Sequence, residues 1–312
     1  MTQAATISTT NWIITISALA IIIGLDFAWA VARRKKDTSM REATAWSLFY
    51  VSLAVAFGLF LSQWLTPREQ QEFFAGWLTE YSLSFDNLFV FVLILTRLKI
   101  DKQKQQLALL IGILIALVLR IIAISLGKAA IERFEWVFFI FGAFLIYTAV
   151  KLFMESTHKD EEEEEEEEED SKLVQFLQRR GLKPFTIALL ALGMTDLLFA
   201  LDSIPAIFGL TENVYIVITA NIFALMGLRQ LYFLIGGLMT RLVYIGKGLS
   251  AVLAFIGFKL LFHAFHAVDI HEIAGWHIPE VTITQSLIVI VSCIGLATIA
   301  SLVSTREKSV KE

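Results

Sequence analysis

Two strongly apolar stretches of the chain carry polar residues near their middle, and their residue types suit one kind of chemistry. The six side chains that could act as ligands are Glu80, Asp86, Asn87, Asp196, Asp202 and Ser203. All of them offer oxygen, and neither stretch contains histidine or cysteine. Hard divalent cations such as Mn²⁺, Mg²⁺ and Ca²⁺ prefer oxygen ligands, whereas Zn²⁺ and Cu⁺ usually recruit nitrogen or sulfur. The residue types therefore predict a site for a hard divalent cation.

The composition places these carboxylates inside a membrane. Of the 312 residues, 56% are hydrophobic and 18% are charged, and the mean hydropathy is +0.68. In soluble domains about a quarter of all residues are charged. Ionisable groups within a membrane span are costly, and they usually face a bundle interior or a watery cavity. A functional site is the favoured interpretation. The alternative is that the acids pair with Arg120 and Arg229 and only hold helices together.

The hydropathy pattern predicts an all-α polytopic membrane protein with about nine spanning helices. The expected spans are residues 12–32, 44–65, 73–97, 106–127, 135–153, 184–209, 214–240, 248–267 and 282–304. Twenty of the 26 Lys and Arg residues lie in the tail and in the loops that share one side. Positive charge collects on the cytoplasmic side. The expected location is a bacterial inner membrane, with the N-terminus outside and the C-terminus in the cytoplasm.

Spans three to five resemble spans six to eight in the order of their charged and polar residues. The aligned pairs are Glu80 with Asp196, Asp86 with Asp202, Asn87 with Ser203, Arg120 with Arg229 and Lys151 with Lys259. Because each unit has three spans, the second unit must cross the membrane in the opposite direction. Inverted repeats of this kind are typical of transporters whose site lies between the repeats. The pattern predicts an inverted 3+3 helix repeat.

Helix geometry limits how the carboxylates can meet at one ion. Positions six residues apart lie about 120° apart around a helix and about 9 Å apart along it. We therefore expect either a broken or bent span near Pro205, which lacks a backbone donor, or the convergence of one carboxylate from each repeat. The basic residues within the spans would supply counter-charge when the cation has left. These residues are Arg120, Arg229 and Lys259.

The repeat and the charge pattern divide the chain into five parts. They are two N-terminal helices (1–72), repeat one (73–153), an acidic cytoplasmic linker (154–183), repeat two (184–267), and an outer loop with the last helix and tail (268–312). The run Glu161–Glu169 predicts a solvated, disordered linker. Asp26 lies in the first span, outside the repeat, and could be an ion or proton contact or a partner for a neighbouring helix.

Three motifs also resemble a known family. They are SLSFDNLFVF (82–91), TDLLFALDSIPAIF (195–208) and NIFALMGLRQLYFLIGG (221–237). The chain resembles the TerC family of integral membrane proteins, named for tellurium resistance, from about Trp46 to His263. The resemblance implies cation export, with manganese efflux associated with members. By motif position, the polar residues that correspond best to the family's are Asp86, Asn87, Asp202 and Ser203, followed by Glu80 and Asp196. Many relatives have a glutamate where this chain has Gly193, three residues before Asp196.

These observations predict a transporter that exports a hard divalent cation, most readily Mn²⁺, in exchange for protons. The alternative is a non-transporting membrane assembly or stress-response scaffold linked to tellurium resistance. An enzyme is not expected, because the chain has no Ser–His or Cys–His pair of the known kinds and no HExxH motif. The expected partners are a divalent metal ion, as cargo rather than cofactor, and the lipid bilayer. Nucleic acid is not expected, and the pattern leaves the oligomeric state open.

Overall fold

The computed structural model describes residues 7–32, 39–98, 100–134, 136–156, 181–228, 230–232, 234, 244–273 and 276–311. Asp86 and Asp202 are described in their backbone only, and Arg229 and the run Glu161–Glu169 lie outside the described residues.

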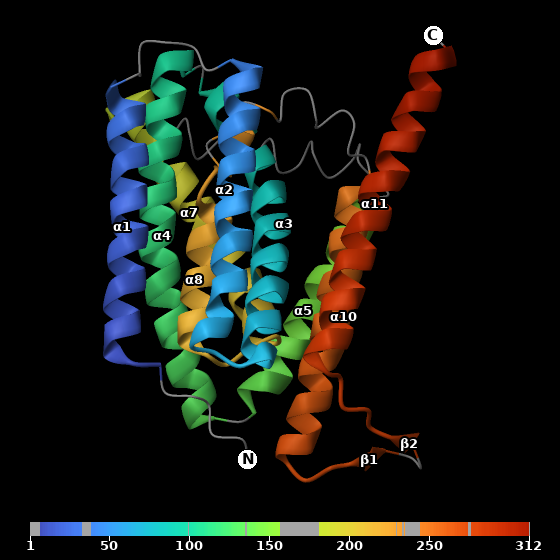
Figure 1. Cartoon of the computed structure of the whole chain (residues 1–312). Coiled ribbons are helices and arrows are strands. Elements are labelled where there is room, and N and C mark those ends of the chain that lie inside the picture. The colour runs from blue at the N-terminus through green and yellow to red at the C-terminus, as the bar shows by residue number, and fades with distance from the viewer. Residues whose placement is uncertain are drawn as a thin grey trace.

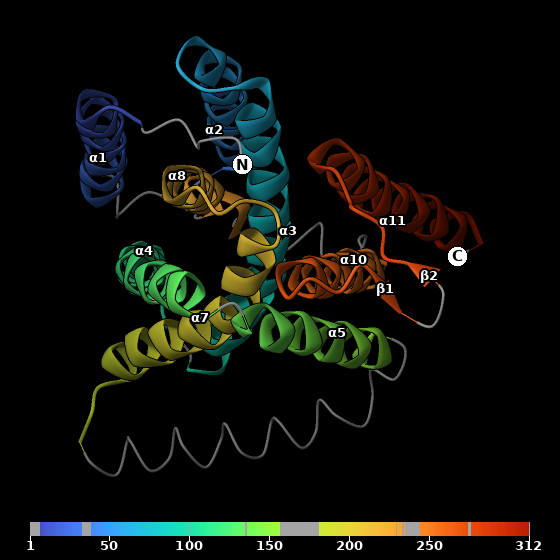
Figure 2. The same ribbon diagram turned by 90° about the horizontal axis from the view of Figure 1, so that it is seen from below.

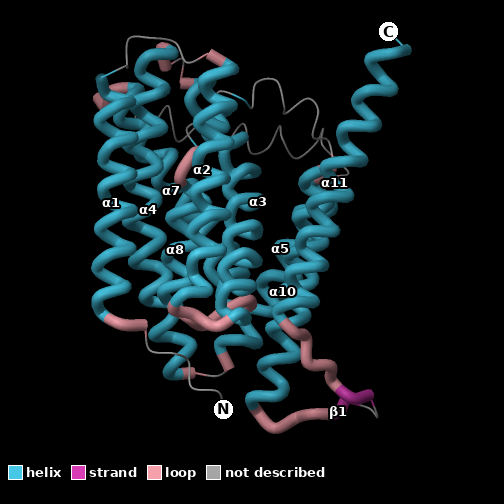
Figure 3. The backbone as a smooth tube through the Cα atoms, in the orientation of Figure 1, coloured by secondary structure: helices cyan, strands magenta, loops and turns pink. Residues whose placement is uncertain are grey.

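The described part of the chain is a helical bundle with one short hairpin (Figures 1 and 3). The long helices are α1 (Thr9–Ala32), α2 (Met40–Phe60), α3 (Pro67–Arg97), α4 (Lys102–Arg133), α5 (Val137–Glu155), α7 (Pro184–Phe208), α8 (Val214–Leu225), α10 (Ile245–Ala267) and α11 (Ile283–Lys311). A 3₁₀ turn, η1 (Leu61–Gln63), follows α2. The strands β1 (Glu272–Ile273) and β2 (Trp276–His277) pair antiparallel between α10 and α11.

Eight helical segments of the described chain are long and apolar enough to cross a membrane. The all-helical membrane architecture is therefore confirmed, but the count of nine is not, because α3 is absent from this set. Its 31 residues are long enough to span. Its composition is less apolar because it carries Arg68, Glu69, Glu72, Glu80, Asp86 and Arg97. The expected third span is thus the helix that holds the predicted acidic ligands of the first repeat.

The helices divide into a central group and a periphery. In the segment Val214–Tyr232, which begins with α8, 88% of the apolar window is buried inside the molecule, against 17% for α1 and for α11. The most extensive contacts join α5 with α10, α3 with α8 and α4 with α7. Figure 2 shows α8 beside α3, and α1 and α11 on opposite margins. The predicted acidic segment of α3 therefore packs against the most buried helical segment, and that of α7 lies on a helix that contacts both α3 and α4.

Helices α5 and α10 cross at a pair of glycines. A Cβ atom on Gly142 would lie 2.9 Å from the carbonyl oxygen of Gly257, and one on Gly257 would lie 3.0 Å from that of Gly142. No side chain fits at either position without moving a backbone. Small residues of this kind let membrane helices approach closely, so that van der Waals packing holds them together.

The expected break at Pro205 is wrong, because α7 runs through this residue to Phe208. Pro205 lies in the last turn, where it removes a single helical hydrogen bond, and its own carbonyl accepts from the Gly209 amide at 2.9 Å. The break occurs instead after α8. Met226 is extended, with ψ 126°, and Gly227 has φ +90°, which favours glycine. Helical bonding resumes when the Leu231 amide donates to the Gly227 carbonyl at 3.0 Å.

Candidate functional site

The guanidinium of Arg120, on α4, binds groups from three other helices. Its Nη1 donates to Glu80 Oε2 on α3 at 2.5 Å and to Asn221 Oδ1 on α8 at 3.0 Å. Its Nε and Nη2 donate to the two carboxylate oxygens of Asp196, on α7, at 3.2 Å each. All four side chains are buried, with exposed fractions of 2% or less. We call Glu80, Arg120, Asp196 and Asn221 the arginine cluster.

Helical spacing explains which residues share a face with this cluster. On α3, Glu80, Ser84 and Asn87 stand at positions i, i+4 and i+7, which lie on one side of a helix. On α7, Asp196 and Ser203 are likewise seven residues apart. All five side chains are buried. The two helices therefore present matching polar stripes, with a carboxylate and a neutral group on each.

Asp86 and Asp202 occupy helix positions outside these polar stripes. Each lies six residues after the acid of the same helix, and both helices are continuous over that interval. The two positions are therefore about 120° from those of Glu80 and Asp196 around the helix axes. A single helix does not aim both of its carboxylates at one ion from one face, so a shared site would require residues from both α3 and α7.

Several buried polar atoms of α3 and α7 have no hydrogen-bond partner among the described residues. They are Glu80 Oε1, Thr79 Oγ1, Ser84 Oγ, Asn87 Nδ2 and Ser203 Oγ. Ser203 lies near enough to act on the Glu80 carboxylate, although its hydroxyl makes no hydrogen bond of ordinary geometry. Buried polar groups are nearly always satisfied by protein, water or an ion. This interface therefore has the capacity to accept a small polar ligand.

The charges of the cluster do not cancel. Glu80 and Asp196 contribute two carboxylates against the single guanidinium of Arg120, which leaves one formal negative charge among buried groups. Such a charge is costly at membrane depth unless it is compensated. A proton or a cation at the free oxygen of Glu80 would neutralise it. The arrangement can thus hold positive charge, with Arg120 as an internal competitor for the same carboxylates.

The structure brings together part of the predicted site. Arg120 bridges Glu80 and Asp196, and Ser203 lies near Glu80, whereas Asn87 is buried on the same side of α3 as Glu80. The side chains of Asp86 and Asp202, and all of Arg229, lie outside the described residues. Among the side chains that are described, no group of three or more His, Cys, Asp or Glu residues is placed to hold a metal. The complete set of six ligands stays a prediction.

Two groups do not follow the sequence-based expectation. Lys259 is half-buried on α10, where it interacts electrostatically with Glu72 and Arg68 near the start of α3. Asn221 belongs to the arginine cluster but was not among the predicted ligands. The sequence does contain a signal for Asn221, because its carboxamide lies within the apolar run YIVITANIFALM, eight residues before Arg229. A buried amide in such a run must find a hydrogen-bond partner.

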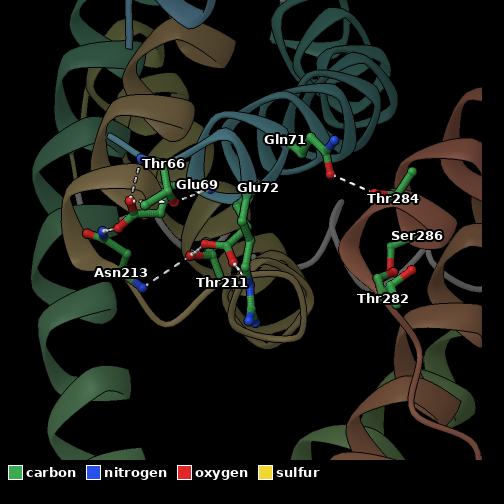
Figure 4. Close-up of polar contacts among 10 residues, drawn as sticks. Thr66, Glu69, Gln71, Glu72, Thr211, Asn213, Thr282, Thr284 and Ser286 are labelled. Carbon is green, nitrogen blue, oxygen red and sulfur yellow. Dashed lines mark hydrogen bonds and ion pairs between the residues drawn. The ribbon is translucent and has the colours of Figure 1, made fainter. Parts of the chain in front are cut away.

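A second polar cluster joins the start of α3 to the connection between α7 and α8 (Figure 4). Thr211 Oγ1 donates to Glu72 Oε2 at 2.6 Å, and Asn213 Nδ2 donates to Glu69 Oε1 at 3.0 Å. The remaining oxygens of these carboxylates accept from Arg68 at 3.0 Å and from the Thr66 amide at 2.9 Å. Every carboxylate oxygen of Glu69 and Glu72 therefore accepts a hydrogen bond from a neighbouring group. This second cluster positions a loop rather than offering a metal site.

Comparisons with known proteins fit this architecture. A family model described as "Integral membrane protein TerC family" matches residues 65–309. An uncharacterized membrane protein of Mycobacterium tuberculosis (strain ATCC 25618 / H37Rv) is 38% identical over 319 residues, which cover 96% of this chain and 80% of the relative. One from Myxococcus xanthus is 38% identical over 288 residues, covering 88% and 86%. A protein of Escherichia coli (strain K12), named "Putative membrane-bound redox modulator Alx", is 34% identical over 280 residues, covering 81% and 85%. No solved structure gives a significant match.

Proposed function

The chain belongs to the integral membrane protein TerC family, and we propose that it is a transporter that exports a hard divalent cation, with Mn²⁺ as its main substrate. The observation that carries this proposal is the arginine cluster and its unsatisfied surroundings. Two buried carboxylates from α3 and α7 share one guanidinium, and one oxygen of Glu80 has no partner within the described part of the chain. The unpartnered hydroxyl of Ser203 near Glu80 would add a neutral oxygen ligand of the kind that Mn²⁺ accepts.

The helix contacts support an inverted repeat. A two-fold axis that exchanges α3 with α7, α4 with α8 and α5 with α10 would relate the α3–α8 contact to the α7–α4 contact. Both are extensive. The same axis would pair α5 with α10 directly, and their glycines approach each other reciprocally. Under this proposal Glu80 and Asp196 are equivalent residues of the two halves, and the site lies where the halves meet.

The proposed topology counts α3 as a ninth span. The buried arginine cluster compensates the carboxylate of Glu80, so that a helix of modest hydropathy can cross the membrane inside the bundle. An odd number of crossings leaves the termini on opposite sides. The excess of Lys and Arg then puts the N-terminus outside and the C-terminus in the cytoplasm.

Charge balance favours exchange for protons. Glu80, Asp86, Asp196 and Asp202 against Arg120 and Arg229 carry a nominal charge of −2. One Mn²⁺ or two protons would balance it equally. In the empty state Arg120 occupies the two carboxylates, and a bound metal would weaken that hold by competing for them. The inward proton gradient of a bacterium would drive the metal outward.

The test is metal accumulation in cells that lack or carry the protein, measured over several divalent metals. Cells carrying the native protein should retain less Mn²⁺. Asp86→Asn and Asp202→Asn should each abolish this difference, because each removes one negative ligand with almost no change in volume. Asp269→Asn is the matched control, since Asp269 is exposed beyond α10. Normal export by both span variants, at equal amounts in the membrane, would refute the proposed site.

A non-transporting assembly role is the second candidate, and one observation favours it. The ion pairs of Arg120 join α3, α4 and α7 in the way that a purely structural network would. This role predicts that the native protein leaves the accumulation of every tested metal unchanged, and that charge-retaining but ligand-poor substitutions leave its function intact. The comparison of cells that lack or carry the native protein therefore separates the two candidates.

A further inference from the structure

Besides its two carboxylate partners, Arg120 has a neutral acceptor that lies on a different helix. Its Nη1 donates both to Glu80 Oε2 and to Asn221 Oδ1, the second at 3.0 Å. Asn221 belongs to α8, whereas the two carboxylates belong to α3 and α7. The guanidinium can therefore stay attached to α8 when it leaves the other two helices.

The carboxamide of Asn221 is held in one orientation by its own helix. Its Nδ2 donates to the carbonyl of Val217, one turn earlier in α8, at 3.1 Å. A carboxamide whose nitrogen is bound in this way presents its oxygen to other donors. The side chain is buried, so this oxygen has a fixed place in the packed core. Asn221 is thus an acceptor that is already positioned for a cationic donor.

This acceptor is not required for the charge balance of the arginine. Glu80 and Asp196 already oppose the guanidinium with two negative charges, and Asn221 adds none. An amide within an apolar helix is costly to bury, and an aliphatic side chain would avoid that cost. In the alignment of the proposed repeats Asn221 falls opposite Gly112, so the first repeat has no amide at this position. A function explains the amide better than packing or internal symmetry does.

A bound divalent cation would change the partners of Arg120. The metal would take carboxylate oxygens of Glu80 and Asp196, which accept hydrogen bonds from the guanidinium in the structure. A buried guanidinium without acceptors is strongly disfavoured. The bond to Asn221 uses no carboxylate oxygen, so it can persist while the metal is bound. Asn221 would then hold the arginine that the metal has displaced.

We infer that Asn221 is a positioning residue that holds Arg120 in the metal-bound state and thereby sets the affinity for the divalent cation. The inference rests on the proposed function, because it takes Glu80 and Asp196 as metal ligands. Without Asn221, Arg120 would lose one of its four described hydrogen bonds in the empty state, but the one that survives in the bound state. The bound state therefore loses more, and the affinity falls.

The test is a calorimetric Mn²⁺ titration of the purified full-length protein. Asn221→Leu has a similar volume but no acceptor, and it should weaken Mn²⁺ binding about tenfold or more, as expected for a lost hydrogen bond to a charged group. Asn221→Asp keeps the oxygen and should bind Mn²⁺ at least as tightly as the native protein. Thr219→Val is the matched control and should bind as the native protein does. The Thr219 hydroxyl is buried on the same helix, where it donates to the backbone carbonyls of Tyr215 and Ile216.

A double-mutant cycle shows whether Asn221 acts through Arg120. In an Arg120→Met background the guanidinium is absent, so Asn221→Leu should change the Mn²⁺ affinity by no more than about twofold. If Asn221 were instead a metal ligand, its loss would weaken binding in this background as well. Melting curves in detergent identify the variants that are folded.

If Arg120→Met does not fold, the Mn²⁺ titrations are repeated with Ca²⁺, which is larger. A loss transmitted through the guanidinium should reduce both affinities by the same factor in Asn221→Leu. The loss of a direct ligand should instead affect the two ions differently, because they differ in size and in ligand number.

Three results would overturn the inference. The first is native Mn²⁺ affinity in Asn221→Leu. The second is an equal loss of affinity in Asn221→Asp and Asn221→Leu, which would make the residue a part of the fold only. The third is a loss that persists without Arg120 or differs between Mn²⁺ and Ca²⁺, which would make Asn221 a metal ligand.

The same variants separate this inference from the proposed function. Mn²⁺ export in cells, together with independent effects of the Asn221 and Arg120 substitutions, would remove only the role of Asn221. The expected binding pattern without Mn²⁺ export would remove the exporter proposal and leave the role of Asn221 standing. A native protein that binds no Mn²⁺ would overturn both.

Discussion

Arg120 connects four helices in the described core through a single buried side chain. It is buried to 1% exposure, and its partners come from α3, α7 and α8. A buried ion pair contributes little net stability against a well-packed apolar substitute, yet removing one partner leaves a buried charge uncompensated. Here that loss would leave two carboxylates. The consequence is a core that is stable only while positive charge is present.

Arg120→Gln should therefore destabilise the protein by about 3–5 kcal/mol, measured as a fall in the melting temperature in detergent. Mn²⁺ should restore more stability to this variant than to the native protein, because the freed carboxylates can bind the metal. Arg133→Gln is the control, since Arg133 is exposed at the end of α4. A Mn²⁺ effect no larger in Arg120→Gln than in the control would show that these carboxylates do not form a cation site.

Gly193 offers a gain-of-charge test at the same interface. It stands three residues before Asp196, where the family resemblance leads one to expect glutamate. A Cβ atom there would lie 3.3 Å from Ile115, a contact that a small shift relieves. Gly193→Glu should bind Mn²⁺ more tightly than Gly193→Gln, which has nearly the same volume, in a direct metal titration. Equal affinities would place this position outside the metal site.

At the scale of elements, the helices were predictable and their breaks were not. The expected span 184–209 corresponds closely to α7, because a run of apolar residues fixes a helix by hydropathy alone. Pro205 was the obvious candidate for a break, but a proline in the last turn disturbs only one bond. Gly227, whose φ is +90°, was not recognised as a break, because a single glycine inside an apolar run is also compatible with a continuous helix.

The site was predictable to a similar extent. Charged residues in apolar runs identified Glu80, Arg120 and Asp196 without knowledge of their contacts. The partner choice of Arg120 was not predictable, because it depends on the tertiary packing of α4 against α7 and α8, and of α3 against the same two helices. Lys259 shows the same limit, since sequence spacing assigned it to the site and packing placed it near Glu72.

The glycine crossing of α5 and α10 gives a prediction for elements. Gly142→Leu should force the two helices apart, because even a Cβ atom would meet the Gly257 carbonyl at 2.9 Å. We expect loss of export. The free energy of unfolding should fall by an amount typical of overpacking, about 1–3 kcal/mol or more, which lowers the melting temperature. Gly295→Leu on α11 is the control, since no atom lies within 4 Å of its Cβ position. Equal melting temperatures for the two variants would contradict a close-packed crossing in solution.

At the scale of the whole molecule, the acidic run and the core should be independent. Deletion of Glu161–Glu169 should leave metal preference unchanged and alter the export rate modestly at most. A solvated run can raise the local cation concentration, but it imposes no coordination geometry. The test measures export of several metals by the deletion variant and by a control variant in which nine glutamines replace Glu161–Glu169. A changed order of preference would make the run part of the binding site.

The charged residues that make α3 less hydrophobic than the other helices also affect how the protein is inserted into the membrane. When α3 leaves the ribosome, Arg120 on α4 has not yet been synthesised, and Asp196 follows only after the linker. A mid-span aspartate costs about 2.5–3.5 kcal/mol during insertion by the translocon, and α3 carries Asp86 as well as Glu80. We therefore expect α3 to be retained beside the translocon until α4 arrives, so that the two helices enter the lipid as a hairpin. The residues that make the core polar would then set the order in which the protein is assembled.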